Sequence, residues 1–138
     1  MQLALVLIQW AYYLYLLDPF TSKVKQRNYK RLLTDKSYFK THLFCSTLFA
    51  TAFLTIAWLK KGNYSVLSSM CLAPLAFIIL TKYLNTYSTK KYNRDFYLVL
   101  RGDTYKYSTF DIVARLTLLI LPWVISLVTI VYLSRSLE

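Results

Sequence analysis

Apolar residues gather into four long blocks along the chain, separated by stretches rich in Lys, Arg and Tyr. The blocks cover residues 3–17, 42–59, 64–84 and 112–133, and none of them contains an acidic residue. An α-helix needs about 20 predominantly apolar residues to cross roughly 30 Å of hydrocarbon. The pattern therefore predicts an all-α fold, an integral membrane helical bundle of four transmembrane helices that forms a single domain.

The first block is the shortest of the four. No Lys or Arg precedes it, no small-residue cleavage pattern follows it, and Asp18-Pro19-Phe20 comes next. These features disfavour a secretory signal peptide, which has a basic start and an Ala-x-Ala-like end. We expect residues 3–17 to be a retained span, and an interfacial or re-entrant segment stays open as the alternative.

The 17 basic residues lie outside the blocks or at their edges, and they are unevenly distributed. Residues 18–41 hold seven of them and residues 82–115 hold seven more, whereas the turn at residues 60–63 holds two and the C-terminal tail one. Cytoplasmic segments of membrane proteins carry the excess of Lys and Arg. We therefore expect both seven-charge segments to be cytoplasmic, with the N-terminus and the C-terminus outside.

The net charge of +11 and the interleaved Tyr residues also occur in nucleic-acid-binding proteins. Basic residues that flank spans have a simpler cause, because anionic lipid head groups attract them by about 1 kcal/mol each. Tyr is likewise frequent where the bilayer meets water. We expect membrane lipids as partners and no nucleic acid.

Catalytic groups are scarce in this sequence. His42 is the single histidine, and we expect it to be an interfacial polar residue. Cys45 and Cys71 match no zinc or redox spacing, and the two glycines form no phosphate-binding loop. No acidic or basic residue lies deep in a block, as an ion path usually requires. We expect no enzyme activity, no metal, no cofactor and no small-molecule substrate.

The second block carries a row of hydroxylated side chains. Thr47, Thr51 and Thr55 recur every four residues, with Ser46 and Ala50 beside them. Small residues let helices approach closely in a membrane, and hydroxyls can bond between helices. Two interpretations remain open: this face packs within the bundle, or it binds a helix from another protein.

Prolines and a capping motif mark the later blocks. Pro74 and Pro122 lie inside the third and fourth blocks, and we expect each to kink its helix because proline removes a backbone donor. Ser108 and Asp111 have the spacing of a capping box, which predicts that the last helix begins near Ser108. Asp111 and Arg115 are predicted to pair across one helical turn.

From about Ser37 onward the chain resembles the three-span immunity proteins that protect bacteria against channel-forming colicins. The matching features follow in chain order: Lys36-Ser37-Tyr38-Phe39-Lys40, Leu72-Ala73-Pro74, Asn93-Arg94-Asp95-Phe96-Tyr97 and Leu121-Pro122. The separation of the two prolines and the course from inside to outside are also similar. The block at residues 3–17 has no counterpart in that family.

The resemblance implies a function and a partner. An immunity protein of this kind sits in the bacterial cytoplasmic (inner) membrane, binds the hydrophobic hairpin of the pore-forming domain of a bacteriocin, and prevents channel opening. The side on which both termini are expected would then be the periplasm. Its partner-binding residues would be those of the threonine row and the matching motifs, Thr47, Thr51, Thr55, Pro74, Asp95, Phe96, Tyr97 and Pro122. The alternative is a small structural subunit of a larger membrane complex, which composition does not separate from the first hypothesis.

Overall fold

The computed structural model describes residues 2–17, 26–59, 72–96 and 108–136, and every regular element in these ranges is a helix. The all-α prediction is therefore confirmed. The helices are α1 (Gln2–Leu17), α2 (Gln26–Thr34), α3 (Lys36–Leu59), α4 (Ala73–Tyr92) and α5 (Thr109–Ser136).

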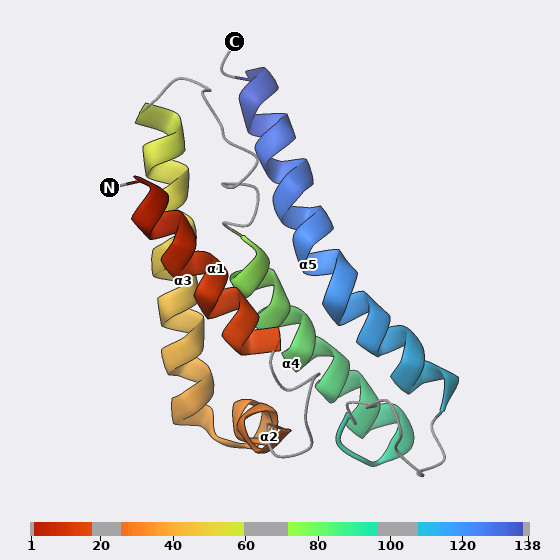
Figure 1. Ribbon diagram of the computed structural model, residues 1–138. Helices are drawn as coiled ribbons and strands as arrows, with labels where there is room; N and C mark the ends of the chain where they lie inside the picture. The colour runs from red at the N-terminus through yellow and green to blue at the C-terminus, as the bar shows by residue number, and fades with distance from the viewer. Residues whose placement is uncertain (1, 18–25, 60–71, 97–107, 137–138) are drawn as a thin grey trace.

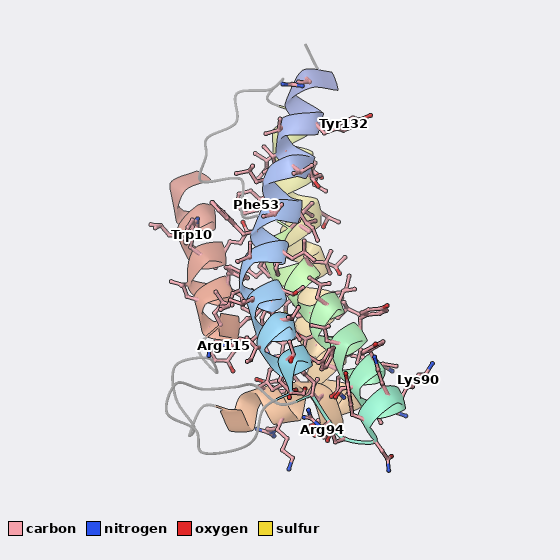
Figure 2. The ribbon with its side chains drawn as sticks, turned by 90° about the vertical axis from the view of Figure 1, so that its right-hand side faces the viewer. Trp10, Phe53, Lys90, Arg94, Arg115 and Tyr132 are labelled. Atoms are coloured by element: carbon pink, nitrogen blue, oxygen red, sulfur yellow. The ribbon has the colours of Figure 1, made fainter. Side chains whose placement is uncertain are left out.

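Four of the helices run along the long direction of the molecule, and the short α2 lies at one end (Figure 1). α1 descends toward α2, α3 rises, α4 descends and α5 rises again. α4 occupies the centre of the bundle and contacts each of the other helices. The start of α3, the end of α4 and the start of α5 consequently meet at the end where α2 lies, and Figure 2 shows Lys90 and Arg94 there, with Tyr132 at the opposite end.

Asp35 begins α3. Its Oδ1 accepts the backbone N–H groups of Ser37 and Tyr38 at 2.9 and 3.2 Å. An aspartate in the N-cap position satisfies donors that have no partner within the helix, and its charge suits the helix N-terminus. Asp35 is the single residue between α2 and α3, and Figure 1 shows the two helices running in different directions on either side of it.

Pro74 lies in the first turn of α4, not in the interior of a helix. A proline there removes no helical hydrogen bond, because the first N–H groups of a helix have no partner in it anyway. The expected kink at Pro74 was therefore wrong. Residues 64–71 of the predicted third span lie outside the described residues.

The other end of α4 is closed by Asn93, which adopts a left-handed conformation with φ of 52° and donates its N–H to the Thr89 carbonyl at 3.1 Å. Asparagine tolerates this conformation better than most residues, so it can end a helix where glycine is absent. The chain can then turn back toward α4 immediately.

α5 begins at the predicted capping box and runs through Pro122. The Ser108 hydroxyl donates to Asp111 Oδ2 at 2.8 Å, the Ser108 N–H reaches the same oxygen at 3.1 Å, and the Asp111 N–H donates back to the Ser108 hydroxyl. The predicted start of the last helix is therefore confirmed.

The core lies between α4, α5 and α1. Phe77 and Ile78 of α4 and Leu118 of α5 are fully buried, with Tyr13 of α1 packed edge-on against Phe77. A hydroxyl also joins the two central helices, because Ser126 Oγ of α5 accepts the N–H of Leu72 at 3.0 Å. That bond satisfies a donor at the start of α4 that no helical carbonyl can reach.

Two of the helices are long and apolar enough to cross a membrane by length and composition, over Lys36–Ile56 and Thr109–Tyr132. Leu7–Leu17 of α1 forms a shorter apolar segment. The second half of α4 carries Lys82, Lys90 and Lys91 on its exposed side. Within the described residues the structure thus supports two of the four predicted spans by this measure.

Candidate partner-binding surface

Thr47, Thr51 and Thr55 form an exposed row on α3, which we call the threonine face. Each hydroxyl donates to the carbonyl four residues earlier in the same helix, at 2.8 to 3.0 Å. These hydroxyls therefore keep their hydrogen bonds without help from a neighbouring helix. A surface whose polar atoms are already bonded can face lipid or an apolar partner helix without leaving a donor unsatisfied.

The opposite side of α3 packs into the bundle. Ser46 and Ala50, which stand next to the threonines in sequence, are 0% and 2% exposed, and Phe53 is also buried. The structure therefore divides the small-residue pattern into two faces. The side that packs within the bundle carries Ser46 and Ala50, and the threonine face points away from it.

Pro74 and Pro122, the other predicted binding residues on helices, are fully buried. Pro74 belongs to the start of α4 and Pro122 to the interior of α5, next to the core described above. Neither ring offers a surface to a partner that approaches the bundle as it stands. Their contribution in this structure is to packing.

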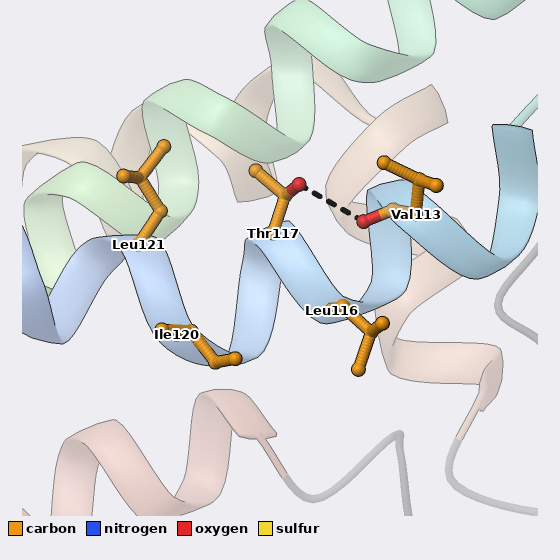
Figure 3. Close-up of a pocket in the computed structure, with 5 residues that line it drawn as sticks. All are labelled: Val113, Leu116, Thr117, Ile120 and Leu121. Atoms are coloured by element: carbon orange, nitrogen blue, oxygen red, sulfur yellow. Dashed lines mark hydrogen bonds between the residues drawn. The ribbon is translucent and has the colours of Figure 1, made fainter.

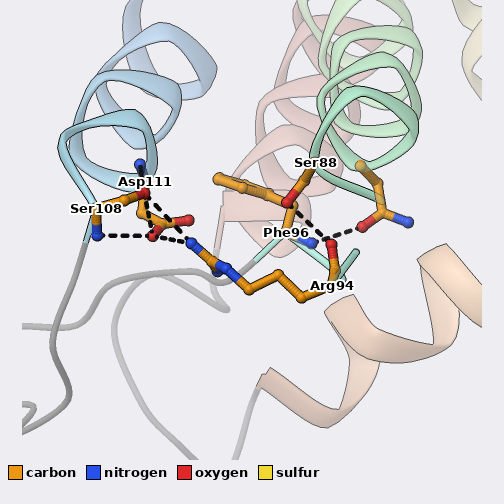
Figure 4. Close-up of polar contacts among 6 residues, drawn as sticks. Ser88, Arg94, Phe96, Ser108 and Asp111 are labelled. Atoms are coloured by element: carbon orange, nitrogen blue, oxygen red, sulfur yellow. Dashed lines mark hydrogen bonds and ion pairs between the residues drawn. The ribbon is translucent and has the colours of Figure 1, made fainter. Parts of the chain in front are cut away.

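Asp95 and Phe96 lie where the chain folds back on the end of α4, and Figure 4 shows Phe96 beside Ser88 of that helix. The N–H of Phe96 donates to Asn85 Oδ1 at 2.8 Å, and the Asn85 amide reaches Asp95 Oδ1 at 3.5 Å. The Ser88 hydroxyl donates to the carbonyl of Arg94 at 3.0 Å. Two polar side chains of α4 thus satisfy the backbone of this segment and fix its position.

The ring of Phe96 is buried against aromatic rings from two other parts of the chain. It meets Tyr29 of α2 with ring centroids 6.3 Å apart and Phe110 of α5 with centroids 6.0 Å apart, both nearly edge-on. Burial raises the pKa of the Tyr29 hydroxyl well above its ordinary value of 10.0, and the charge of Asp95 acts in the same direction. Phe96 is therefore one of the residues that pack α2 against the bundle, and Tyr97, which follows it, lies outside the described residues.

Arg94 connects the same segment to α5. Its guanidinium reaches Asp111 Oδ2 at 2.6 Å and the Ser108 hydroxyl at 3.3 Å (Figure 4). The predicted pairing of Asp111 with Arg115 is replaced by this ion pair from 17 residues earlier. A sequence pattern identifies pairs one helical turn apart and gives no signal for such a distant partner.

His42 lies in a cluster of tyrosines that the sequence did not indicate. The hydroxyl of Tyr12 in α1 is 2.8 Å from His42 Nδ1 and 3.3 Å from Ser46 Oγ. The Tyr38 ring meets the imidazole edge-on at 4.4 Å, and the Tyr15 hydroxyl bonds to that of Tyr38 at 2.9 Å. The only available signal was spacing, since Tyr12 and Tyr15 share one helix face and so do Tyr38 and His42.

An apolar depression of about 340 Å³ lies on the outer side of α5. Figure 3 shows its lining, which is formed by Val113, Leu116, Thr117, Ile120 and Leu121. The hydroxyl of Thr117 donates to the Val113 carbonyl at 2.9 Å, so this surface is also free of unsatisfied polar atoms. It is a second exposed helix face of the kind seen on α3.

Among the described residues, no three His, Cys, Asp or Glu side chains come together as metal ligands. Comparisons of the chain with models of protein families, with curated proteins and with solved structures found no match.

Proposed function

We propose that this chain is a four-span inner-membrane immunity protein, which binds the inserting helices of a pore-forming bacteriocin and prevents the channel from opening. The observation that carries the proposal is the threonine face, an exposed small-residue surface on a long apolar helix. Small side chains of this kind favour close contact between helices in lipid. The resemblance to three-span colicin immunity proteins from Ser37 onward supplies the class of partner.

The alternating course of α1, α3, α4 and α5 supports the four-span arrangement (Figure 1). With the α2 end in the cytoplasm, both termini face the periplasm, from which a toxin enters. The contact of Tyr12 with His42 supports α1 as part of the bundle, because it packs this shorter helix against α3. The proposal places the threonine face toward lipid, where an inserting helix meets it.

The mechanism requires binding only. A protein shifts a conformational equilibrium when it binds one state more tightly than another. The threonine face would bind the toxin's hairpin in its closed arrangement and compete with the contacts that the open channel needs. Asp95 and Phe96 would act indirectly, because they hold α2 and the end of α4 in place.

The test is a measurement of inner-membrane potential with a voltage-sensitive dye, in bacteria that express the chain and receive a panel of pore-forming domains. We expect protection against one toxin. Thr51→Leu with Thr55→Leu should abolish protection, because the larger leucine side chains prevent the close approach of a partner helix. Leucine favours membrane insertion, so the variant should still reach the membrane. The matched control is Thr129→Leu on α5, whose hydroxyl also bonds to a carbonyl of its own helix.

Depolarisation by every toxin, with the chain inserted at normal abundance, would contradict the proposal. Stable co-purification with many other chains in mild detergent, without any toxin, would then favour the structural-subunit hypothesis. Full protection by the Thr51 and Thr55 double variant would retain the immunity function and remove the threonine face as its site.

A further inference from the structure

Exposed cations from three helices gather at one end of the molecule. α2, the start of α3 and the end of α4 lie together there (Figure 1), although they are far apart in sequence. We call this surface the basic end and define it by six exposed side chains, those of Lys30, Arg31, Lys36, Lys40, Lys90 and Lys91.

α2 is attached to the bundle by one side and exposes cations on the other. Tyr29 and Leu32 are 5% and 3% exposed, whereas Lys30 and Arg31 are exposed to the surroundings. The contact of Tyr29 with Phe96 fixes the rotation of the helix about its own axis. A short helix with one apolar side and one basic side is typical of segments that lie along a membrane surface.

The acidic residues in the described part of this end neutralise little of its charge. Asp111 is buried and paired with Arg94. Asp35 and Asp95 accept hydrogen bonds from neutral amides and therefore keep their negative charge. Six cations against these two carboxylates still leave a positive surface that calls for an anionic partner.

Aromatic side chains lie beside these cations. Arg31 stands over the Tyr38 ring at 5.5 Å, and Lys91 donates to the Tyr87 hydroxyl at 3.0 Å. That hydrogen bond raises the pKa of Lys91 above its ordinary value of 10.5. Tyr83 and Tyr92 are exposed on the same helix. Tyr and basic residues together are typical of the head-group layer, where the ring is half immersed and the charge meets phosphate.

We propose that the basic end is a binding surface for anionic phospholipid head groups, with α2 lying in the head-group layer as an interfacial helix. The position of α2 favours lipid over an acidic protein, because it lies level with the ends of α3 and α5, the two helices long enough to cross a bilayer. The planar guanidinium of Arg31 suits a phosphate, which it can bind with two parallel hydrogen bonds.

The test uses the full chain purified in neutral detergent with equal amounts of phosphatidylglycerol and phosphatidylcholine, and counts retained lipids by native mass spectrometry. We expect selective retention of phosphatidylglycerol that weakens as salt is added. Lys30→Gln with Arg31→Gln should lower this affinity by about fivefold for each cation removed. Arg135→Gln, which removes an exposed cation from the far end of α5, should leave it unchanged.

Thermal unfolding of each variant checks that the bundle remains intact, as expected for substitutions of exposed side chains. Equal retention of the two lipids by the folded wild-type chain would overturn the proposal. An equal loss of phosphatidylglycerol retention in the Lys30 and Arg31 variant and in the Arg135 variant would also overturn it. Binding of an acidic peptide without any preference between the lipids would overturn it in favour of a protein partner. The proposal does not depend on the immunity function.

Discussion

Asp111 shows how much one side chain does at the end of the bundle. The residue is 1% exposed, and its Oδ2 accepts from Arg94 and from the Ser108 hydroxyl and backbone N–H. Its Oδ1 is buried without a hydrogen-bond partner. A buried carboxylate that is only partly satisfied depends strongly on its cation, because removal of that cation leaves the charge uncompensated. The Ser108 contact was predictable from spacing, whereas the Arg94 contact depends on where α4 ends.

The substitution Arg94→Gln should therefore destabilise the protein by about 1.5 to 3 kcal/mol, the range for a lost hydrogen bond to a charged group. Thermal unfolding in detergent measures the change. Lys90→Gln, at an exposed position four residues earlier, is the control and should change stability by less than about 0.5 kcal/mol. Equal stability of the Arg94 variant and the control would show that the ion pair does not hold the two helices together.

Tyr12 offers a second test at the scale of single residues. The change Tyr12→Phe removes the hydroxyl that meets His42 and Ser46 but keeps the ring, so we expect a loss of about 0.6 to 2 kcal/mol. Tyr83→Phe is the control, because the Tyr83 side chain is 67% exposed. If the unfolding temperatures of the two variants coincide, the Tyr12 hydroxyl contributes nothing to the packing of α1.

At the scale of elements, the sequence predicted the helices with long apolar runs and missed α2. Nine residues that include Lys30 and Arg31 have no apolar run, so they gave no sign of a membrane span. The signal that was available is amphipathic, because Tyr29, Leu32 and Leu33 are the apolar residues among basic and polar ones. So short a helix becomes stable through burial against the bundle, and the local sequence does not show where that surface lies. The kink expected at Pro74 was wrong for a related reason. The apolar pattern of the third block does not show that α4 begins at Ala73, which puts Pro74 in the first turn of the helix.

The change Leu32→Ala should release α2 from the bundle. Removal of a buried leucine side chain costs about 2 to 5 kcal/mol, which is large for a helix of nine residues. Hydrogen exchange should show faster exchange of α2 amides with little change in α4. Thr34→Ala, on the exposed side of α2, should leave the exchange of that helix close to wild type. Slow exchange of α2 in the Leu32 variant would mean that Tyr29 and Leu33 are sufficient to hold it.

At the scale of the whole molecule, the all-α class and the two long apolar helices were predictable because they follow from local composition. The arrangement of the helices was not. It depends on contacts between distant residues, such as Tyr12 with His42 and Arg94 with Asp111, and each partner is an ordinary polar residue when considered alone. The division of α3 into a buried side and the threonine face likewise follows from where its neighbours lie.

The proposed topology can be tested by labelling single cysteines in a chain that carries Cys45→Ser and Cys71→Ser. In spheroplasts, a membrane-impermeant maleimide should label Arg135→Cys at once and Lys30→Cys only after lysis. Both positions are exposed in the structure, so burial does not protect either. Labelling of both before lysis would contradict a cytoplasmic α2 end.

The bond between Tyr12 and His42 also imposes an order on biogenesis. Tyr12 is synthesised 30 residues before His42 and 34 residues before Ser46, so α1 cannot complete its polar contacts until the first half of α3 has been made. During that interval the Tyr12 hydroxyl depends on water or on groups outside the chain. α1 is thus made before α3 and fixed only after it.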